Sequence, residues 1–248
     1  MDMKKKVIVL GGTSSIGKAI ARRFAREGWQ VLIVAQNFEE CIEVTDSLEG
    51  ANHIGCNVDV CKEGDMIKLK NLVENKFKDF DSLVNTLDLS QKHAALQSDF
   101  VAWDNLLQVM LYGTVRSCRI LIPFIKDGGR IIHITSILYE RVSNGSSAYG
   151  VAKAAITQFS RSLAVELAPR NILSNIIAPG FVSTTMSETH SEWETDRVKN
   201  KYINDNLPLK RMGNPEEIAG VTWFLAGPDA SYMTGSVCTV DGGMTVTF

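Results

Sequence analysis

The sequence predicts an α/β protein in which a seven-stranded parallel sheet is covered by helices on both faces, a doubly wound arrangement. Short apolar runs alternate with longer segments of helical periodicity, and several of these runs are continuous rather than alternating in polarity. Continuous apolar runs are typical of strands buried on both faces, as in parallel sheets. Their alternation with helices of 10–15 residues indicates βαβ units.

The expected strands share β-branched and apolar content. They span residues 7–10, 31–35, 53–58, 83–85, 130–135, 172–177 and 237–240. After the first run, Ile16, Ile20 and Phe24 recur at the spacing of a helix face. No proline- or serine-rich linker and no repeat divides the chain, so we expect one domain over residues 1–248.

The composition excludes several classes of function. The 248 residues include 26 Lys and Arg against 28 Asp and Glu, a formal net charge of −2. Proteins that neutralise nucleic-acid phosphates usually carry a basic surplus, so no nucleic-acid partner is expected. No apolar stretch approaches the roughly 20 residues that a membrane helix needs, so no membrane partner is expected either.

The cysteines and histidines predict neither disulfides nor a metal site. The five cysteines are scattered and odd in number, which indicates free thiols in a reducing cytoplasm. The four histidines lie far apart, without the spacing of zinc ligands.

A glycine-rich segment lies between the first expected strand and the first expected helix. Gly11 and Gly12 would allow a tight turn close to a diphosphate, and Gly17 would let the helix pack closely on the strand. The helix N-terminus would add backbone N–H groups and a positive dipole. The alternative is an ordinary tight turn. The predicted contacts to a dinucleotide here are Gly11, Thr13, Ser14, Ser15, Ile16 and Gly17.

The choice of dinucleotide depends on the end of the second strand. An acidic residue there would bind the ribose of NAD, and a nearby arginine would favour NADP. This chain has Gln36 and Asn37 instead, while Glu39 and Glu40 should lie within the next helix. The missing acid removes a repulsion against a 2′-phosphate without supplying an attraction. Both dinucleotides therefore remain open, with a lean toward NADP.

A candidate reaction centre follows the fifth expected strand. Tyr149 and Lys153 are four residues apart and would share one face of a helix. The lysine charge would lower the pKa of the tyrosine, which could then transfer a proton near neutral pH. Ser136, at the strand end, could hydrogen-bond a substrate oxygen. Taken alone, the Tyr–Lys spacing also fits a solvent-exposed helix face.

In combination, these motifs resemble the short-chain dehydrogenase/reductase family, in its single-domain branch, over residues 4 to 245. The resemblance rests on the glycine loop, on Ser136, Tyr149 and Lys153 in order and spacing, and on two further segments. These are 56–60, with Asp59 and Val60, and the Pro-Gly segment 178–184. Residues 211–219 and 234–243 are similar to the tail of 3-oxoacyl-carrier-protein reductases.

The resemblance implies a Rossmann fold, NAD or NADP as cofactor, and hydride transfer between the nicotinamide and a carbonyl or secondary alcohol. It makes Tyr149 the proton donor or acceptor, Lys153 the group that lowers its pKa and binds the nicotinamide ribose, and Ser136 the group that orients the oxygen. It further implies a homotetramer or homodimer formed through helices at 99–113 and 148–168. The remaining implied cofactor contacts are Gln36, Asp59, Val60, Asn85, Pro179, Gly180, Val182 and Thr184.

Four residues depart from the family pattern. Leu10 and Ser15 replace a threonine and a glycine of the loop. Asp88 replaces a glycine after the fourth strand and would bring negative charge near an anionic ligand. Met110 replaces the asparagine that holds a water in the proton relay; because methionine has no donor, we expect an impaired or rerouted relay.

The substrate region resembles a lid over residues 185–207, with Met186 and Trp193 as apolar contacts; the alternative is a solvated excursion. Residues 137–139 and His93 could also line the pocket. The leading hypothesis is an NAD(P)H-dependent carbonyl reductase acting on a ketone or a 3-oxoacyl thioester, which could be bound to a carrier protein. The alternatives are a dehydrogenase of a sugar, steroid or other secondary alcohol, and a dinucleotide-binding scaffold or sensor with little turnover.

Overall fold

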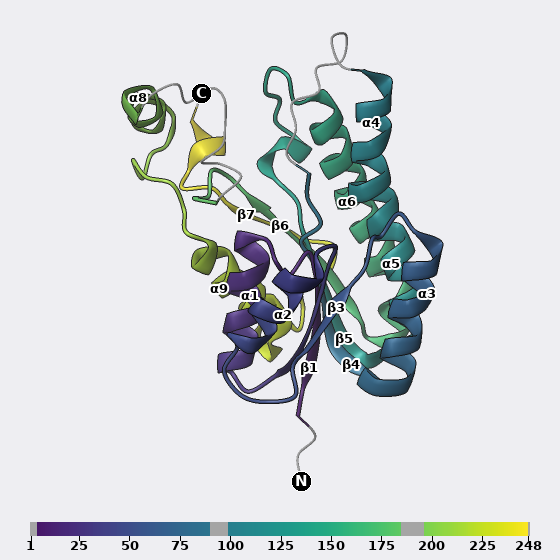
Figure 1. The fold of residues 1–248 in the computed structure, drawn as a ribbon. Coiled ribbons are helices and arrows are strands. Elements are labelled where there is room, and N and C mark those ends of the chain that lie inside the picture. Colours follow the sequence, from purple (N-terminus) through teal and green to yellow (C-terminus); the bar gives the residue numbers. More distant parts are fainter. Residues whose placement is uncertain (1–3, 90–98, 185–195, 248) are drawn as a thin grey trace.

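The computed structural model describes residues 4–89, 99–184 and 196–247 (Figure 1). A single sheet of seven parallel strands runs through the molecule in the order β3-β2-β1-β4-β5-β6-β7. The strands are β1 (Lys6–Leu10), β2 (Gln30–Ala35), β3 (Ile54–Asn57), β4 (Phe80–Asn85), β5 (Ile125–Ile134), β6 (Leu173–Pro179) and β7 (Val237–Val240). The predicted doubly wound parallel sheet is confirmed.

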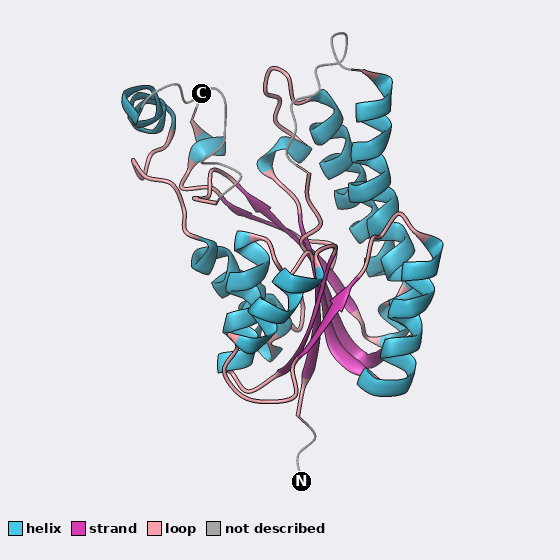
Figure 2. Cartoon of the chain, viewed as in Figure 1, coloured by secondary structure: helices cyan, strands magenta, loops and turns pink. Residues whose placement is uncertain are grey.

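Helices cover both faces of this sheet, as Figures 1 and 2 show. One face carries α1 (Ser15–Arg26), α2 (Phe38–Asp46) and α9 (Pro215–Ala226). The other carries α3 (Glu63–Leu72), α4 (Phe100–Leu107), α5 (Gly113–Leu121) and α6 (Ser147–Glu166). A further helix, α8 (Asp196–Asn206), precedes α9. No helix among the described residues is both long and apolar enough to cross a bilayer.

The continuous apolar runs are explained by this two-sided cover. In β1, Val7 and Val9 face the core beneath α1 and α9, whereas Ile8 and Leu10 face the core beneath α3 and α5. All four are fully buried. Because successive side chains of a strand point to opposite faces, a strand covered on both sides can be apolar at every position, as β1 is from Val7 to Leu10.

Strand β5 begins earlier than the sequence predicts. Lys126, Asp127 and two glycines read as a turn, yet they belong to the strand, with Gly128 at φ +79°. The register with β4 shifts at this point, because Phe80 pairs with Ile125 while Ser82 pairs with Arg130. The extra residues form an irregularity in the ladder, which a glycine at positive φ accommodates.

The strand order places the functional region. The chain moves outward from β1 to β2 and β3, and then returns to form β4 on the other side of β1. In open α/β sheets, ligands bind beyond the carboxyl ends of the strands where the order reverses. The glycine loop, the segments after β4 and β5, and the start of α6 all lie at this edge.

Candidate functional site

The glycine loop is tied to the end of β4. Thr86 donates its hydroxyl hydrogen bond toward the carbonyl oxygens of Leu10 and Gly11, at 2.7 and 2.9 Å. Gly11 has φ +72°, and a Cβ there would lie 2.7 Å from the Thr86 carbonyl oxygen. A side chain is therefore excluded by both the backbone conformation and the close approach of β4.

The loop leads directly into α1. Ser14 caps this helix by accepting a hydrogen bond from the Gly17 N–H at 3.0 Å. A Cβ on Gly17 would overlap the Gly11 carbonyl oxygen, so the helix can start this close to the loop only with glycine. Residues 13–16 are partly exposed at the N-terminus of a 12-residue helix. These residues fit a diphosphate, since the helix dipole and backbone N–H groups favour an anion there.

The predicted adenosine end lies beyond β2 and β3. The Gln36 side chain is exposed, and its amide donates to Asp59 at 3.3 Å. Asn37 caps α2 by accepting from the Glu40 N–H at 3.1 Å, which places Glu39 and Glu40 inside that helix as expected. The strand end carries no charged side chain at positions 36 and 37, so the structure keeps the cofactor choice open.

Val60 completes this end of the site and depends on a residue that the sequence reading missed. Val60 is buried, and a Cβ on Gly113 would lie only 2.6 Å from its Cγ2 atom. Gly113 therefore lets the start of α5 pack against the segment after β3. Its sequence signal is a lone glycine inside a long helical pattern.

The Pro-Gly segment stands on the opposite side of the sheet edge. Pro179 ends β6, and the Gly180 N–H donates to the Val240 carbonyl at 2.9 Å. A Cβ on Gly180 would lie 2.7 Å from the Cβ of Asp241, which explains glycine at this position. Val182 is buried and pairs with Gly213, and Thr184 is partly exposed.

Asn85 lies beneath the site rather than open to it. Its side chain is 1% exposed. The amide nitrogen donates to the Thr114 hydroxyl at 2.7 Å and lies 3.3 Å from Nδ1 of His133, while the amide oxygen accepts from the Leu87 N–H at 3.0 Å. The amide is therefore engaged by internal contacts that fix the segment after β4.

Helix α6 brings Tyr149 and Lys153 together, as its spacing predicts. The Lys153 Nζ atom lies 5.2 Å from the centroid of the Tyr149 ring and donates to the Ile134 carbonyl at 3.3 Å. Lys153 is only 1% exposed. The small side chains Ala148 and Ala152 on the same helix pack against α4 and the turn that follows it, which holds the polar pair at the sheet edge.

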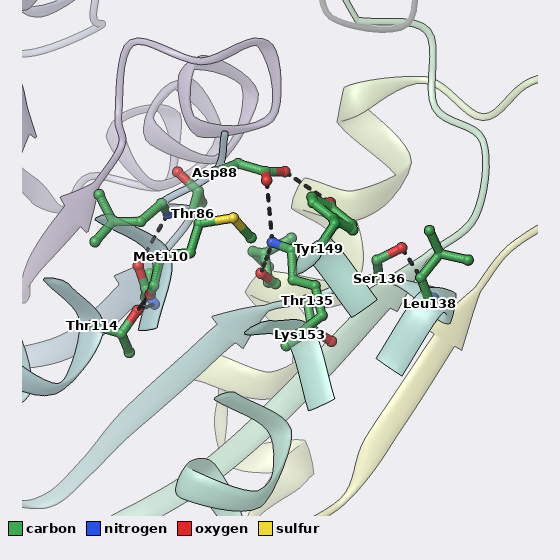
Figure 3. A network of polar contacts seen from close by, with 12 residues as sticks. Thr86, Asp88, Met110, Thr114, Thr135, Ser136, Leu138, Tyr149 and Lys153 are labelled. Atoms are coloured by element: carbon green, nitrogen blue, oxygen red, sulfur yellow. Dashed lines mark hydrogen bonds and ion pairs between the residues drawn. The ribbon is translucent and has the colours of Figure 1, made fainter. Parts of the chain in front are cut away.

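Ser136 joins this pair from the end of β5. Its backbone is extended, and its hydroxyl oxygen accepts from the Leu138 N–H at 3.2 Å (Figure 3). The Ser136 hydroxyl acts to lower the pKa of Tyr149, against the larger effects of burial and Asp88. The structure therefore brings the three predicted reaction-centre residues into one place.

Asp88 adds a carboxylate at a position that its sequence context does not indicate. The sequence predicts it near an anionic ligand, but its carboxylate lies on the reaction centre (Figure 3). The Tyr149 hydroxyl donates to Oδ2 at 3.1 Å, and the Lys153 ammonium lies 3.6 Å from Oδ1. Asp88 and Tyr149 are 61 residues apart, so spacing could not have shown the contact.

The charges at this centre reverse one expectation. The pKa of Tyr149 is raised well above its ordinary value, first by burial and then by the charge and hydrogen bond of Asp88. The net shift of the Tyr149 pKa is therefore upward, opposite to the expected lowering, because burial and Asp88 dominate in this arrangement. Burial also lowers the pKa of Lys153, and the contact with Asp88 opposes that shift.

Met110 closes the centre on the side of α4. It lies in a single π-helical turn, Gln108–Tyr112, and is fully buried among Leu106, Ala148 and Ala152. Its carbonyl oxygen accepts from the Thr114 hydroxyl at 2.5 Å. The side chain offers no donor, as predicted.

The predicted substrate contacts are described only in part. Ile137–Tyr139 forms a short 3₁₀ turn after Ser136, with Ile137 buried and Leu138 and Tyr139 partly exposed. Helix α8 occupies the later part of the expected lid. His93, Met186 and Trp193 lie outside the described residues. Within the described ranges, no group of three or more His, Cys, Asp or Glu side chains could hold a metal ion.

Comparison with known proteins agrees with this arrangement. Residues 11–245 match the family model described as Enoyl-(Acyl carrier protein) reductase. Carbonyl reductase family member 4 of Xenopus laevis is 34% identical over 98% of both chains. A 3-oxoacyl-acyl-carrier-protein reductase of Aquifex aeolicus (strain VF5) is 35% identical over 97% of both.

Solved structures show the same fold. A short-chain dehydrogenase/reductase from Serratia marcescens BCRC 10948 has a TM-score of 0.88 at 28% identity, covering 97% of this chain and 98% of that one. A dehydrogenase/reductase from Sinorhizobium meliloti 1021 has a TM-score of 0.88 at 29% identity, covering 97% and 94%. The chain therefore belongs to the short-chain dehydrogenase/reductase family and is an oxidoreductase of the class that uses NAD(H) or NADP(H).

Proposed function

We propose that this protein is an NADPH-dependent reductase of a carbonyl group in a 3-oxoacyl thioester, carried on coenzyme A or a carrier protein. The convergence of Ser136, Tyr149 and Lys153 beside the glycine loop is the observation that supports it most strongly. Relatives named as 3-oxoacyl-acyl-carrier-protein reductases and carbonyl reductases support the substrate class.

The proposed cofactor contacts follow the sheet edge. The loop 11–17 would hold the diphosphate, and Asp59 with Val60 would contact the adenine. Lys153 would bind the nicotinamide ribose, and residues 179–184 would hold the carboxamide. NADPH is proposed over NADH because positions 36 and 37 at the end of β2 carry no acidic side chain to bind the ribose of NAD, although the Gln36 amide already donates to Asp59.

The chain's own groups would handle the oxygen of the substrate. The bound nicotinamide supplies the hydride to the carbonyl carbon. The Ser136 hydroxyl would donate a hydrogen bond to the carbonyl oxygen, and Tyr149 would give its proton to that oxygen as the charge develops. Tyr149 is protonated at neutral pH, the form that an acid needs, but its raised pKa makes it a weaker acid than an unperturbed phenol.

Further proposals concern the whole chain. We propose that residues 1–248 form one domain, that residues 185–207 cover the substrate, and that the protein forms a homotetramer or homodimer. A reducing cytoplasmic location fits the five cysteines, all of which are free thiols.

A second candidate function is supported by Asp88. Its carboxylate accepts a hydrogen bond from the Tyr149 hydroxyl and pairs with the Lys153 ammonium. A substrate and a ribose would otherwise contact these two groups. A site closed in this way would suit a dinucleotide-binding sensor with little turnover.

A titration followed by an assay separates these functions. Purified protein is titrated with NADPH and NADH, and the loss of reduced-nicotinamide absorbance is then followed with 3-oxoacyl thioesters and simple ketones. We expect tighter binding of NADPH and turnover of a 3-oxoacyl thioester. Binding without reduction of any carbonyl, and without oxidation of any sugar, steroid or other secondary alcohol, would support the sensor. No binding of either dinucleotide would reject both functions.

A further inference from the structure

The position of the Asp88 carboxylate has a consequence for proton transfer. Its two oxygens divide between the reaction-centre groups: Oδ2 accepts the Tyr149 proton at 3.1 Å, and Oδ1 lies 3.6 Å from the Lys153 ammonium (Figure 3). The proton that Tyr149 would give to a substrate is therefore already hydrogen-bonded to a base.

Asp88 lies at the boundary between the buried Lys153, the partly exposed Tyr149 and solvent. The Lys153 side chain is 1% exposed, whereas the Asp88 side chain is 25% exposed. Asp88 therefore reaches water while touching both groups. Because Oδ1 is buried beside Lys153, proton exchange with the phenol and with water would both take place at Oδ2.

The neighbouring side of the centre offers no such path. Met110 is fully buried and has no hydrogen-bond donor, and it packs with Leu106 against α6. The Met110 carbonyl accepts from the Thr114 hydroxyl, which in turn accepts from the Asn85 amide. These contacts run along the interior rather than toward Tyr149. On the side of Met110 the described side chains therefore offer Tyr149 no relay, whereas Asp88 accepts directly from its hydroxyl.

We propose that Asp88 is a catalytic residue that relays protons between solvent and the Tyr149 hydroxyl. This inference rests on the proposed reductase function. After Tyr149 gives its proton to the carbonyl oxygen, the Asp88 carboxylate takes up one proton from water and passes it to the phenolate. Tyr149 is then a hydroxyl again, Asp88 is a carboxylate again, and one solvent proton has entered the product alcohol.

The charges around the relay support this direction. The described titratable groups facing Asp88 are Tyr149 and Lys153, both from α6; Ser136 contributes a hydroxyl from the end of β5. The negative charge of Asp88 raises the pKa of Tyr149, which returns the proton to the phenol between turnovers. It also opposes the lowering of the Lys153 pKa by burial.

The kinetic test compares Asp88→Asn with the conservative Asp88→Glu. The amide cannot relay a proton, so we expect kcat for carbonyl reduction to fall about 10²-fold while KM changes little. The kcat of Asp88→Glu should be at least tenfold higher than that of Asp88→Asn. The basic limb of the pH–rate profile should move to lower pH in Asp88→Asn, because the Tyr149 pKa falls. An equal or higher kcat with an unchanged pH profile would overturn the relay.

A spectroscopic readout does not depend on turnover. Tyrosinate absorbance is titrated for wild type and Asp88→Asn, each against its Tyr149→Phe counterpart, so that the other four tyrosines cancel. Removing Asp88 should make Tyr149 ionise at lower pH. Circular dichroism confirms that each variant is folded, and Asp88→Gly, which also removes the carboxylate, replaces Asp88→Asn if that variant is not. An unchanged Tyr149 titration would overturn the contact on which the relay depends.

Met110 provides a coupled test. Asp88→Gly removes the relay, and Met110→Asn adds an amide donor on the other side. If Asp88 compensates for the missing donor, Asp88→Gly should lower kcat in the wild-type chain. In a chain that already carries Met110→Asn, the fold decrease in kcat should be at least ten times smaller. Equal losses in both backgrounds would contradict compensation. A wild type without turnover rejects the proposed function, whereas an active wild type with an unaltered Asp88→Asn rejects only the relay.

Discussion

The two halves of the sheet edge differ in how they use buried polar groups. In the cofactor half, formed after β1, β2 and β3, the polar contacts are turns, helix caps and exposed side chains such as Gln36 and Asp59. In the reaction half, formed after β4 and β5, titratable side chains lie buried, among them Lys153 and His133. The cofactor half depends on backbone shape, and the reaction half on charge.

Lys153 and His133 show what burial does with and without a partner. Burial lowers the pKa of both groups, but Lys153 has the Asp88 carboxylate beside it. His133 has only the neutral Asn85 amide at 3.3 Å, and its Nε2 atom makes no hydrogen bond to a described residue. Its pKa falls to about 4. The counter-charge of Asp88 therefore opposes the effect of burial on Lys153, whereas His133 has no such counter-charge.

The largest expected effect in the reaction half is that of Tyr149→Phe. Removing the hydroxyl removes the proposed acid, so we expect kcat to fall at least about 10³-fold. Dinucleotide affinity should stay within about tenfold, because the cofactor half is unchanged. Steady-state kinetics and a binding titration check this. Unchanged turnover would show that Tyr149 is not the acid. It would also contradict the assignment of proton transfer to the reaction half.

The second prediction concerns acid stability. Unfolded His133 would bind a proton below its ordinary pKa of 6.5, whereas the folded residue binds one only near pH 4. Stability is therefore complete above pH 6.5 and falls as the pH drops toward 4, by about 3 kcal/mol from this residue. Urea denaturation across this range should show a shallower fall for His133→Gln. The same fall in both proteins would mean that His133 is not buried neutral.

The smallest effect is expected in the cofactor half. In Gly17→Ala the new Cβ would overlap the Gly11 carbonyl oxygen, so the loop must shift. We expect about 2 kcal/mol lower stability and about tenfold weaker dinucleotide binding, with kcat at saturation little changed. Gly64→Ala is the matched control, since a Cβ there meets nothing within 4 Å. If Gly17→Ala lowered kcat more than affinity, the two halves would not be separable.

The sheet was largely predictable because its signals are local. Runs rich in apolar and β-branched residues identified all seven strands, and several of these runs are continuous because their strands are covered on both faces. The exception is the start of β5, where Gly128 and its neighbours read as a turn. Their place in the ladder depends on pairing with β4, which local sequence does not reveal.

The reaction centre was predictable in membership but not in its electrostatics. Helical spacing and strand position identified Ser136, Tyr149 and Lys153. The contact of Asp88 with Tyr149 and Lys153 joins segments distant in the chain, and the raised pKa of Tyr149 follows from burial that only the folded structure shows. The π turn around Met110 likewise reads as continuous helix, because the apolar periodicity does not break there.

Isotope transfer tests the central claim most directly. NADPH carrying deuterium at the transferable position of the nicotinamide is mixed with the protein and a 3-oxoacyl thioester, and the product is examined by mass spectrometry. The account predicts product with one deuterium on the carbinol carbon from wild type. Tyr149→Phe should form almost no labelled product in the same time, although both proteins bind the cofactor. Product lacking deuterium, or equal transfer by the two proteins, would contradict it.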